Sequence, residues 1–193
     1  GLQLPHPQNG QAISLAERPS LMLRERIKSL ESRITEMIRH GQENEAIVAN
    51  LIAWARQLLL TEDTAALPGT VVTALKEVFS VPHCALRLWS VKPQYAALPC
   101  AASVEADTVT LANSMRVPFC GSNVGFEAAT WFEDGAAVQS LAMLPLRVGA
   151  DPKTFGLLVL GSADKDRFHI TMGTAFLERI AELASAALAR MRA

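Results

Sequence analysis

A charged segment near the N-terminus places the strongest constraint on what this chain can fold into. Residues 17–45 hold six Arg or Lys and six Glu side chains, with neither Gly nor Pro between Ser20 and His40. The large apolar residues of this segment repeat at the d and a positions of a heptad: Leu23, Ile27, Leu30, Ile34 and Met37. A narrow apolar seam on a charged helix is typical of a coiled coil. We therefore expect a stalk helix over residues 19–44, preceded by an N-terminal extension over residues 1–18.

The seam predicts a homodimer, because nothing within the segment itself can cover it. In a parallel dimer Arg26 at position g would face Glu31 at position e of the other copy, which is an attractive pair. The alternative is a solvated amphipathic helix that packs on its own domain.

Beyond the stalk the apolar stripe becomes broader, after the heptad breaks at Gly41 and Asn44. A broad stripe is typical of a helix that packs on a globular core. The residues that resume the heptad are Val48, Leu51, Ala55 and Leu58. We expect one globular domain over residues 45–193.

The composition excludes several classes of protein. Half of the residues are hydrophobic and 19% are charged, which excludes an intrinsically disordered chain. The net charge of −1 argues against a nucleic-acid partner and against a polybasic membrane module. Cys84, Cys100 and Cys120 form no CxxC pair, and no apolar run reaches the length of a membrane span. We therefore expect a cytoplasmic protein with no membrane partner and no cofactor.

The remaining periodicities predict mixed α and β structure. Helices are expected over residues 67–78, with Pro68 in the first turn, and over residues 171–191. Strands are expected over residues 85–89, 101–104, 140–148 and 155–161. Residues 108–115 fit either a helix or a strand, and residues 119–135 fit a loop with a short helix. This order predicts an α+β fold, an antiparallel sheet flanked by helices that pack to one side.

Two strand segments carry a first resemblance. The stretches SLAMLPLR at residues 140–147 and FGLLVLGS at residues 155–162 resemble the hairpin of GAF domains. A second resemblance is closer and covers nearly the whole chain. Its most specific piece is Arg167-Phe-His169 followed by Met172-Gly-Thr174. Other pieces are Leu4-Pro-His6, Leu86-Arg-Leu-Trp89, Phe119-Cys-Gly121 and Gly161-Ser-Ala-Asp164.

These pieces resemble the proteobacterial domain-of-unknown-function family 484, which is described as GAF-like. The resemblance implies a GAF-like domain, here preceded by a long N-terminal dimerisation helix. It implies no activity, because the family has none assigned.

Cys120 is the one candidate for covalent chemistry. Some GAF proteins reduce free methionine sulfoxide with a cysteine, and others attach bilin chromophores to one. The resemblance therefore admits a redox enzyme that uses Cys120. The alternative is a small buried thiol. It is favoured because no His or acidic residue close in sequence would lower the pKa of the Cys120 thiol.

Arg87 is the fixed charge closest to the pocket that a GAF-like fold implies. It shares a strand face with Ala85 and Trp89. It would hold an anionic ligand group in a bidentate fork, or pair with an internal carboxylate such as Glu127 or Asp164. Both alternatives remain open from the sequence.

The ligand pocket is expected between the sheet and the loops of residues 100–135. The candidate ligand-binding residues are Arg87, Phe119, Cys120, Gly121 and Phe126. No metal ligands are nominated, because Asp164 and Asp166 fit no metal-site spacing and are expected to organise a turn. The predicted function is a non-enzymatic sensory or scaffold module that dimerises and binds a small ligand, with the redox enzyme as the alternative.

Overall fold

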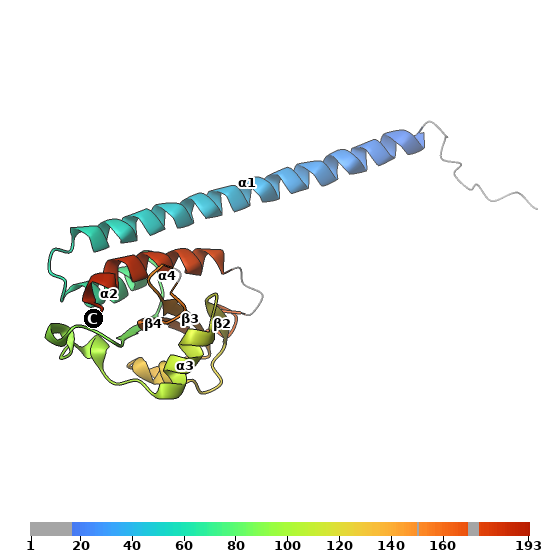
Figure 1. Cartoon of the computed structure of the whole chain (residues 1–193). Helices are drawn as coiled ribbons and strands as arrows, with labels where there is room; N and C mark the ends of the chain where they lie inside the picture. The colour runs from blue at the N-terminus through green and yellow to red at the C-terminus, as the bar shows by residue number, and fades with distance from the viewer. Residues whose placement is uncertain (1–16, 150, 170–173) are drawn as a thin grey trace, which may run out of the picture. The chain divides into compact units, whose positions relative to one another are not determined.

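The structure is a computed structural model that describes residues 17–149, 151–169 and 174–193. The chain divides into two compact units, Gly1–Ala46 and Ile47–Ala193. Within the first unit the described residues form the N-terminal part of helix α1 (Glu17–Leu60) (Figure 1). Pro19 lies in the first turn of α1, where its missing N–H removes no helical hydrogen bond.

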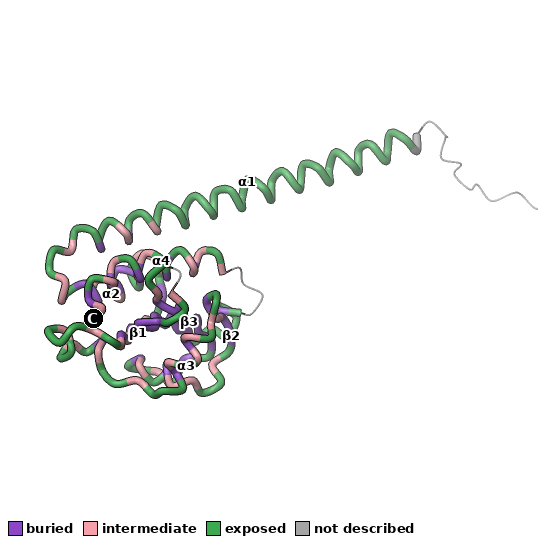
Figure 2. Tube along the Cα trace, in the orientation of Figure 1, coloured by how far each residue is buried: buried purple, intermediate pink, exposed green. Residues whose placement is uncertain are grey.

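The predicted seam of α1 is exposed in the single chain, as the colouring of Figure 2 shows for the whole segment. Its five residues are Leu23, Ile27, Leu30, Ile34 and Met37.

The last turns of α1 belong to the second unit and pack on its core. Trp54 is fully buried, and its indole Nε1 donates a hydrogen bond to the Val71 carbonyl at 3.3 Å. Leu58 is also buried, whereas Ile52 and Leu59 are exposed. The heptad that resumes after Asn44 therefore directs Leu58 into the domain itself.

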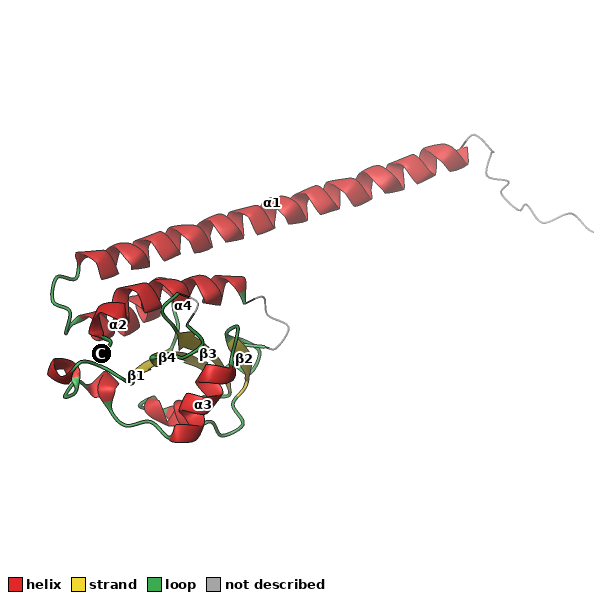
Figure 3. Cartoon of the chain, viewed as in Figure 1, coloured by secondary structure: helices red, strands yellow, loops and turns green. Residues whose placement is uncertain are grey.

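A four-stranded antiparallel sheet forms the centre of the second unit (Figure 3). The strands are β1 (His83–Leu88), β2 (Phe119–Ser122), β3 (Ser140–Leu146) and β4 (Gly156–Ser162), in the order β1-β4-β3-β2. Every residue of the central strands β3 and β4 is buried. The predicted α+β class is confirmed, and the two strands predicted over residues 140–148 and 155–161 pair as the antiparallel hairpin β3–β4.

Helices cover both faces of the sheet, so the prediction that they pack to one side is wrong. The first face packs on the end of α1, on α2 (Leu67–Phe79) and on α4 (Ala175–Leu188). The second face packs on α3 (Ala106–Ser114) and the 3-10 turn η3 (Glu127–Trp131). The physical reason is visible in β3 and β4, whose side chains are apolar on both faces and need cover on each.

Two predicted segments differ from the structure. Residues 101–104 form no strand, and the 3-10 turn η2 (Pro99–Ala101) occupies the start of this segment, because Pro99 lacks an N–H for a ladder. The loop predicted from residue 119 instead opens with strand β2. The ambiguous residues 108–115 lie largely in helix α3. The predicted start of the last helix at Thr171 lies outside the described residues.

Further 3-10 turns connect these elements: η1 (Pro93–Tyr95), η4 (Gly135–Ala137) and η5 (Ala189–Met191). No helix in the described part of the chain combines the length and apolarity needed to cross a bilayer.

Candidate functional site

A pocket of about 520 Å³ lies beside β1, which is an edge strand of the sheet. It is lined by residues 83–87 of β1, by one side of α2 from Pro68 to Lys76, by η2 and by the end of η3. Its volume is in the range of small-molecule sites. The pocket therefore brings together segments that are far apart in the sequence.

Arg87 is one of the residues that line this pocket, and it is half-buried. Its guanidinium carbon stands 5.5 Å from the centre of the Trp131 ring, a cation–π contact. Its Nη1 donates a hydrogen bond to the Leu86 carbonyl at 3.2 Å. The guanidinium is thus oriented along β1 and holds no carboxylate partner among the described residues.

Two further basic side chains line the same pocket. Lys76 comes from α2, and His83 comes from β1, four residues before Arg87 and on the same strand face. The His83 ring is also held in place, since its centre lies 5.7 Å from that of Phe132. Glu133 is the acidic residue of the lining. The balance of charge favours an anionic ligand.

The environment of the two pocket thiols disfavours their thiolate forms. Cys84 and Cys100 both line the pocket. Burial raises the pKa of Cys84 to about 12, and the nearby Lys76 offsets only part of that shift. Burial also raises the pKa of Cys100, against the smaller opposing effects of its backbone hydrogen bond and Arg87. A thiolate nucleophile is disfavoured at both positions.

Of the five residues predicted from the sequence to bind a ligand, Arg87 lines this pocket and the other four do not. Phe119 and Phe126 form an edge-to-face pair, with ring centres 5.5 Å apart, at the β2 end of the sheet. A Cβ on Gly121 would lie 2.9 Å from Cζ of Phe119, so glycine permits this aromatic packing. Cys120 is buried in the core on the first face of the sheet, which α2 and α4 cover, and burial raises the pKa of its thiol as well.

The sequence analysis missed Lys76, His83 and Trp131. Side chains alternate between the two faces of a strand, so His83 lies on the same face as Arg87 and could have been predicted from the sequence. Lys76 and Trp131 gave no local signal, because they reach the pocket through tertiary packing alone.

The family of the chain follows from its sequence as a whole. The family model described as "Protein of unknown function, DUF484" matches residues 1–192. The chain belongs to the DUF484 family. No curated protein gave a significant match to this DUF484 protein.

Solved structures show which fold the DUF484 protein shares. One is the GAF domain of a protein described as a sensor histidine kinase from Pseudomonas syringae pv. tomato, at 20% identity and a TM-score of 0.50. That match covers 79% of this chain and 91% of the other. Another is the GAF domain of the phosphoenolpyruvate-protein phosphotransferase from Acinetobacter, at 13% identity and a TM-score of 0.55. It covers 74% of this chain and 92% of the other. The DUF484 protein is GAF-like.

Two residues of the most specific motif, Arg167 and Phe168, have a structural role, whereas Met172 and Gly173 lie outside the described residues. Arg167 donates to the carbonyls of Phe79 and Ser80 at 3.3 and 2.9 Å, at the C-terminal end of α2. Asp164 accepts a hydrogen bond from the Asp166 amide at 2.9 Å, which is the predicted turn. Phe168 is buried beside these groups. Arg167 and Phe168 therefore fix the loop after β4 against α2.

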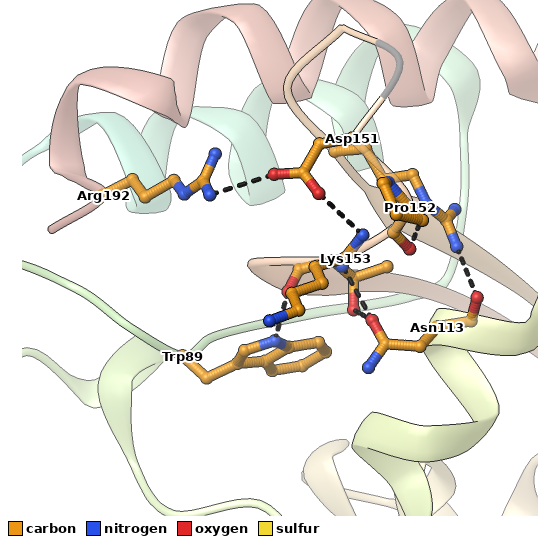
Figure 4. A network of polar contacts seen from close by, with 8 residues as sticks. Trp89, Asn113, Asp151, Pro152, Lys153 and Arg192 are labelled. Carbon is orange, nitrogen blue, oxygen red and sulfur yellow. Dashed lines mark hydrogen bonds and ion pairs between the residues drawn. The ribbon is translucent and has the colours of Figure 1, made fainter.

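A polar network secures the other end of β1 in the DUF484 protein (Figure 4). The Trp89 indole donates to the Thr154 carbonyl at 2.6 Å, and Asn113 Oδ1 accepts from both the amide and the hydroxyl of Thr154. Arg192 pairs with Asp151 at 3.0 Å. These contacts join β1, α3 and the C-terminus to the turn before β4. In the described residues no three His, Cys, Asp or Glu side chains gather to hold a metal ion.

Proposed function

We propose that this DUF484 protein is a non-enzymatic, cytoplasmic sensory or scaffold module that binds a small anionic ligand beside β1 and dimerises through its N-terminal helix. The observation that supports it best is the convergence of Lys76, His83 and Arg87 on one pocket. The sensory role is an analogy with the sensor histidine kinase whose GAF domain has the same fold.

The ligand class follows from the lining. Apolar contacts with a few charged groups suit a compact organic anion, and a guanidinium binds a carboxylate or phosphate in a bidentate fork. A redox enzyme based on Cys120 is the alternative function. It is disfavoured because burial raises the pKa of that thiol and no nearby base offsets the shift.

A thermal-shift screen against small carboxylates and phosphates tests the ligand proposal. A ligand at a hundredfold excess over its dissociation constant adds about 2.7 kcal/mol of stability. In a protein of this size each added kcal/mol of stability raises Tm by roughly 2–4 °C, so the shift is easily measured.

The same screen is repeated on Arg87→Ala and Lys76→Ala. Both variants should lose most of the shift, while Arg116→Ala, an exposed residue outside the pocket, should keep it. A shift that survives both substitutions would place the ligand elsewhere, for example at Phe119 and Phe126.

The dimer proposal is supported by the exposure of all five seam residues of α1. Ile27→Asp combined with Ile34→Asp should convert the dimer to a monomer by light scattering. Leu21→Asp is the matched control, because Leu21 is exposed at position b, away from the seam. A wild-type protein that is monomeric at tens of micromolar would contradict the proposal.

A further inference from the structure

The outer edge of β1 presents unpaired main-chain groups. Trp89 N donates to the Phe155 carbonyl at 2.8 Å, so this pair directly after β1 is hydrogen-bonded. In an antiparallel ladder, hydrogen-bonded and non-hydrogen-bonded pairs alternate. The odd-numbered residues of β1 therefore bond to β4, whereas Cys84 and Leu86 turn their N–H and carbonyl groups away from it.

These outward groups border the pocket, since both Cys84 and Leu86 line it. In the part of the chain that the structure describes, neither amide has a hydrogen-bond acceptor, and the Leu86 carbonyl accepts only from Arg87 Nη1. The turn η2 lies near β1 but forms no main-chain hydrogen bond with it in the described residues. An edge of this kind is a template for an added strand.

The two sides of the pocket differ in chemistry. The first side, toward which Leu86 points, is formed by α2 and is largely apolar, with Pro68 and Val72. On the second side lie His83 and Arg87. Successive side chains of a strand point to opposite faces. A strand residue opposite Leu86 would meet the apolar wall, and its two neighbours would meet the basic groups.

We infer that this pocket takes a short extended peptide segment with an acidic–apolar–acidic pattern, which adds to β1 as a further antiparallel strand. The inference rests on the proposed function and names the ligand class of the same site. Charge complementarity supports the choice, because the fixed cations Lys76 and Arg87 outnumber the acidic Glu133 in the lining. In the complex the ligand amide replaces Arg87 Nη1 at the Leu86 carbonyl, and this frees the guanidinium to bind a flanking carboxylate.

The test is a heteronuclear NMR titration of the full chain with acetyl-Asp-Val-Asp-amide. The amide signal of Leu86 should shift downfield as it gains the valine carbonyl as an acceptor. The same peptide with an N-methylated valine has no donor for the Leu86 carbonyl and should bind at least about tenfold more weakly. Acetyl-Lys-Val-Lys-amide should not bind. Arg87→Gln should weaken binding of the acidic peptide, while Arg116→Gln should not.

Equal binding of the methylated and unmethylated peptides would overturn the inference, because the edge of β1 would then play no part. Shifts confined to residues 119–126 would overturn it as well. A small dicarboxylate such as succinate is titrated in parallel. If succinate binds in an Arg87-dependent manner and neither acidic peptide binds, the strand-addition inference fails while the proposed anion site stands.

Discussion

Gly156→Ala should destabilise the domain, because glycine is required where β4 passes between its neighbours. Gly156 pairs with Leu88 of β1 on one side and with Leu146 of β3 on the other. A Cβ at this position would lie 2.6 Å from Leu88 Cδ2, 2.8 Å from the Arg87 carbonyl oxygen and 3.2 Å from Leu146 Cδ1. A leucine methyl can rotate away, but the Arg87 carbonyl belongs to the β1 backbone.

The expected cost is that of overpacking a filled core, about 1–3 kcal/mol. The reduced entropy of the unfolded chain returns only about 0.4–1 kcal/mol. A net loss of about 1.3 kcal/mol would lower Tm by about 3–5 °C in a domain of this size. Differential scanning calorimetry measures this directly.

Gly69→Ala is the matched control for that experiment. Gly69 lies inside α2, and a Cβ there would meet nothing within 4 Å. Alanine in a helix interior is about 0.5–1 kcal/mol more favourable than glycine, so this Tm should rise. The two substitutions add the same methyl group and should shift Tm in opposite directions. An unchanged Tm for Gly156→Ala would refute the close approach of β1 and β4.

Three other predictions concern the polar network and the thiols. Asn113→Ala leaves the buried Thr154 amide and hydroxyl without their acceptor and should cost about 1–3 kcal/mol in urea unfolding. The pKa of the Asp151 carboxyl is lowered, first by the hydrogen bond from the Lys153 amide and also by Arg192. The ionised carboxylate therefore contributes fully to the stability of the fold above the ordinary aspartate pKa, and this contribution is lost as pH falls through the lowered pKa. Asp151→Asn should therefore lower Tm at neutral pH, and the difference from wild type should vanish on that acid limb. Cys120 should react slowly with thiol reagents at neutral pH, since burial raises its pKa, and Cys120→Ala should keep the fold.

The fold could be predicted from the sequence where the pattern is local. The hairpin of β3 and β4 was recognisable because both strands are continuous apolar runs separated by a turn. Helix α2 was recognisable from its apolar spacing and from Pro68 in its first turn. The cover on both faces of the sheet was missed, because α3 and η3 are short and only moderately apolar.

The candidate site was much less predictable. Arg87 was nominated because a basic residue in the middle of an apolar strand is conspicuous, and the structure places it in the pocket lining. The neighbours that give it a pocket come from α2 and from the end of η3, and no sequence spacing connects them to β1. The Phe119–Phe126 region was nominated because it combines glycine, cysteine and aromatic residues. The structure places packed aromatic rings and a buried thiol there.

The most direct test of the anion-site proposal is a crystal structure of the protein soaked with the anion that gives the largest thermal shift. The account predicts ligand density between α2 and β1, with an anionic group within hydrogen-bond distance of Arg87 or Lys76. Density over Phe119 and Phe126, with the pocket beside β1 empty, would contradict it.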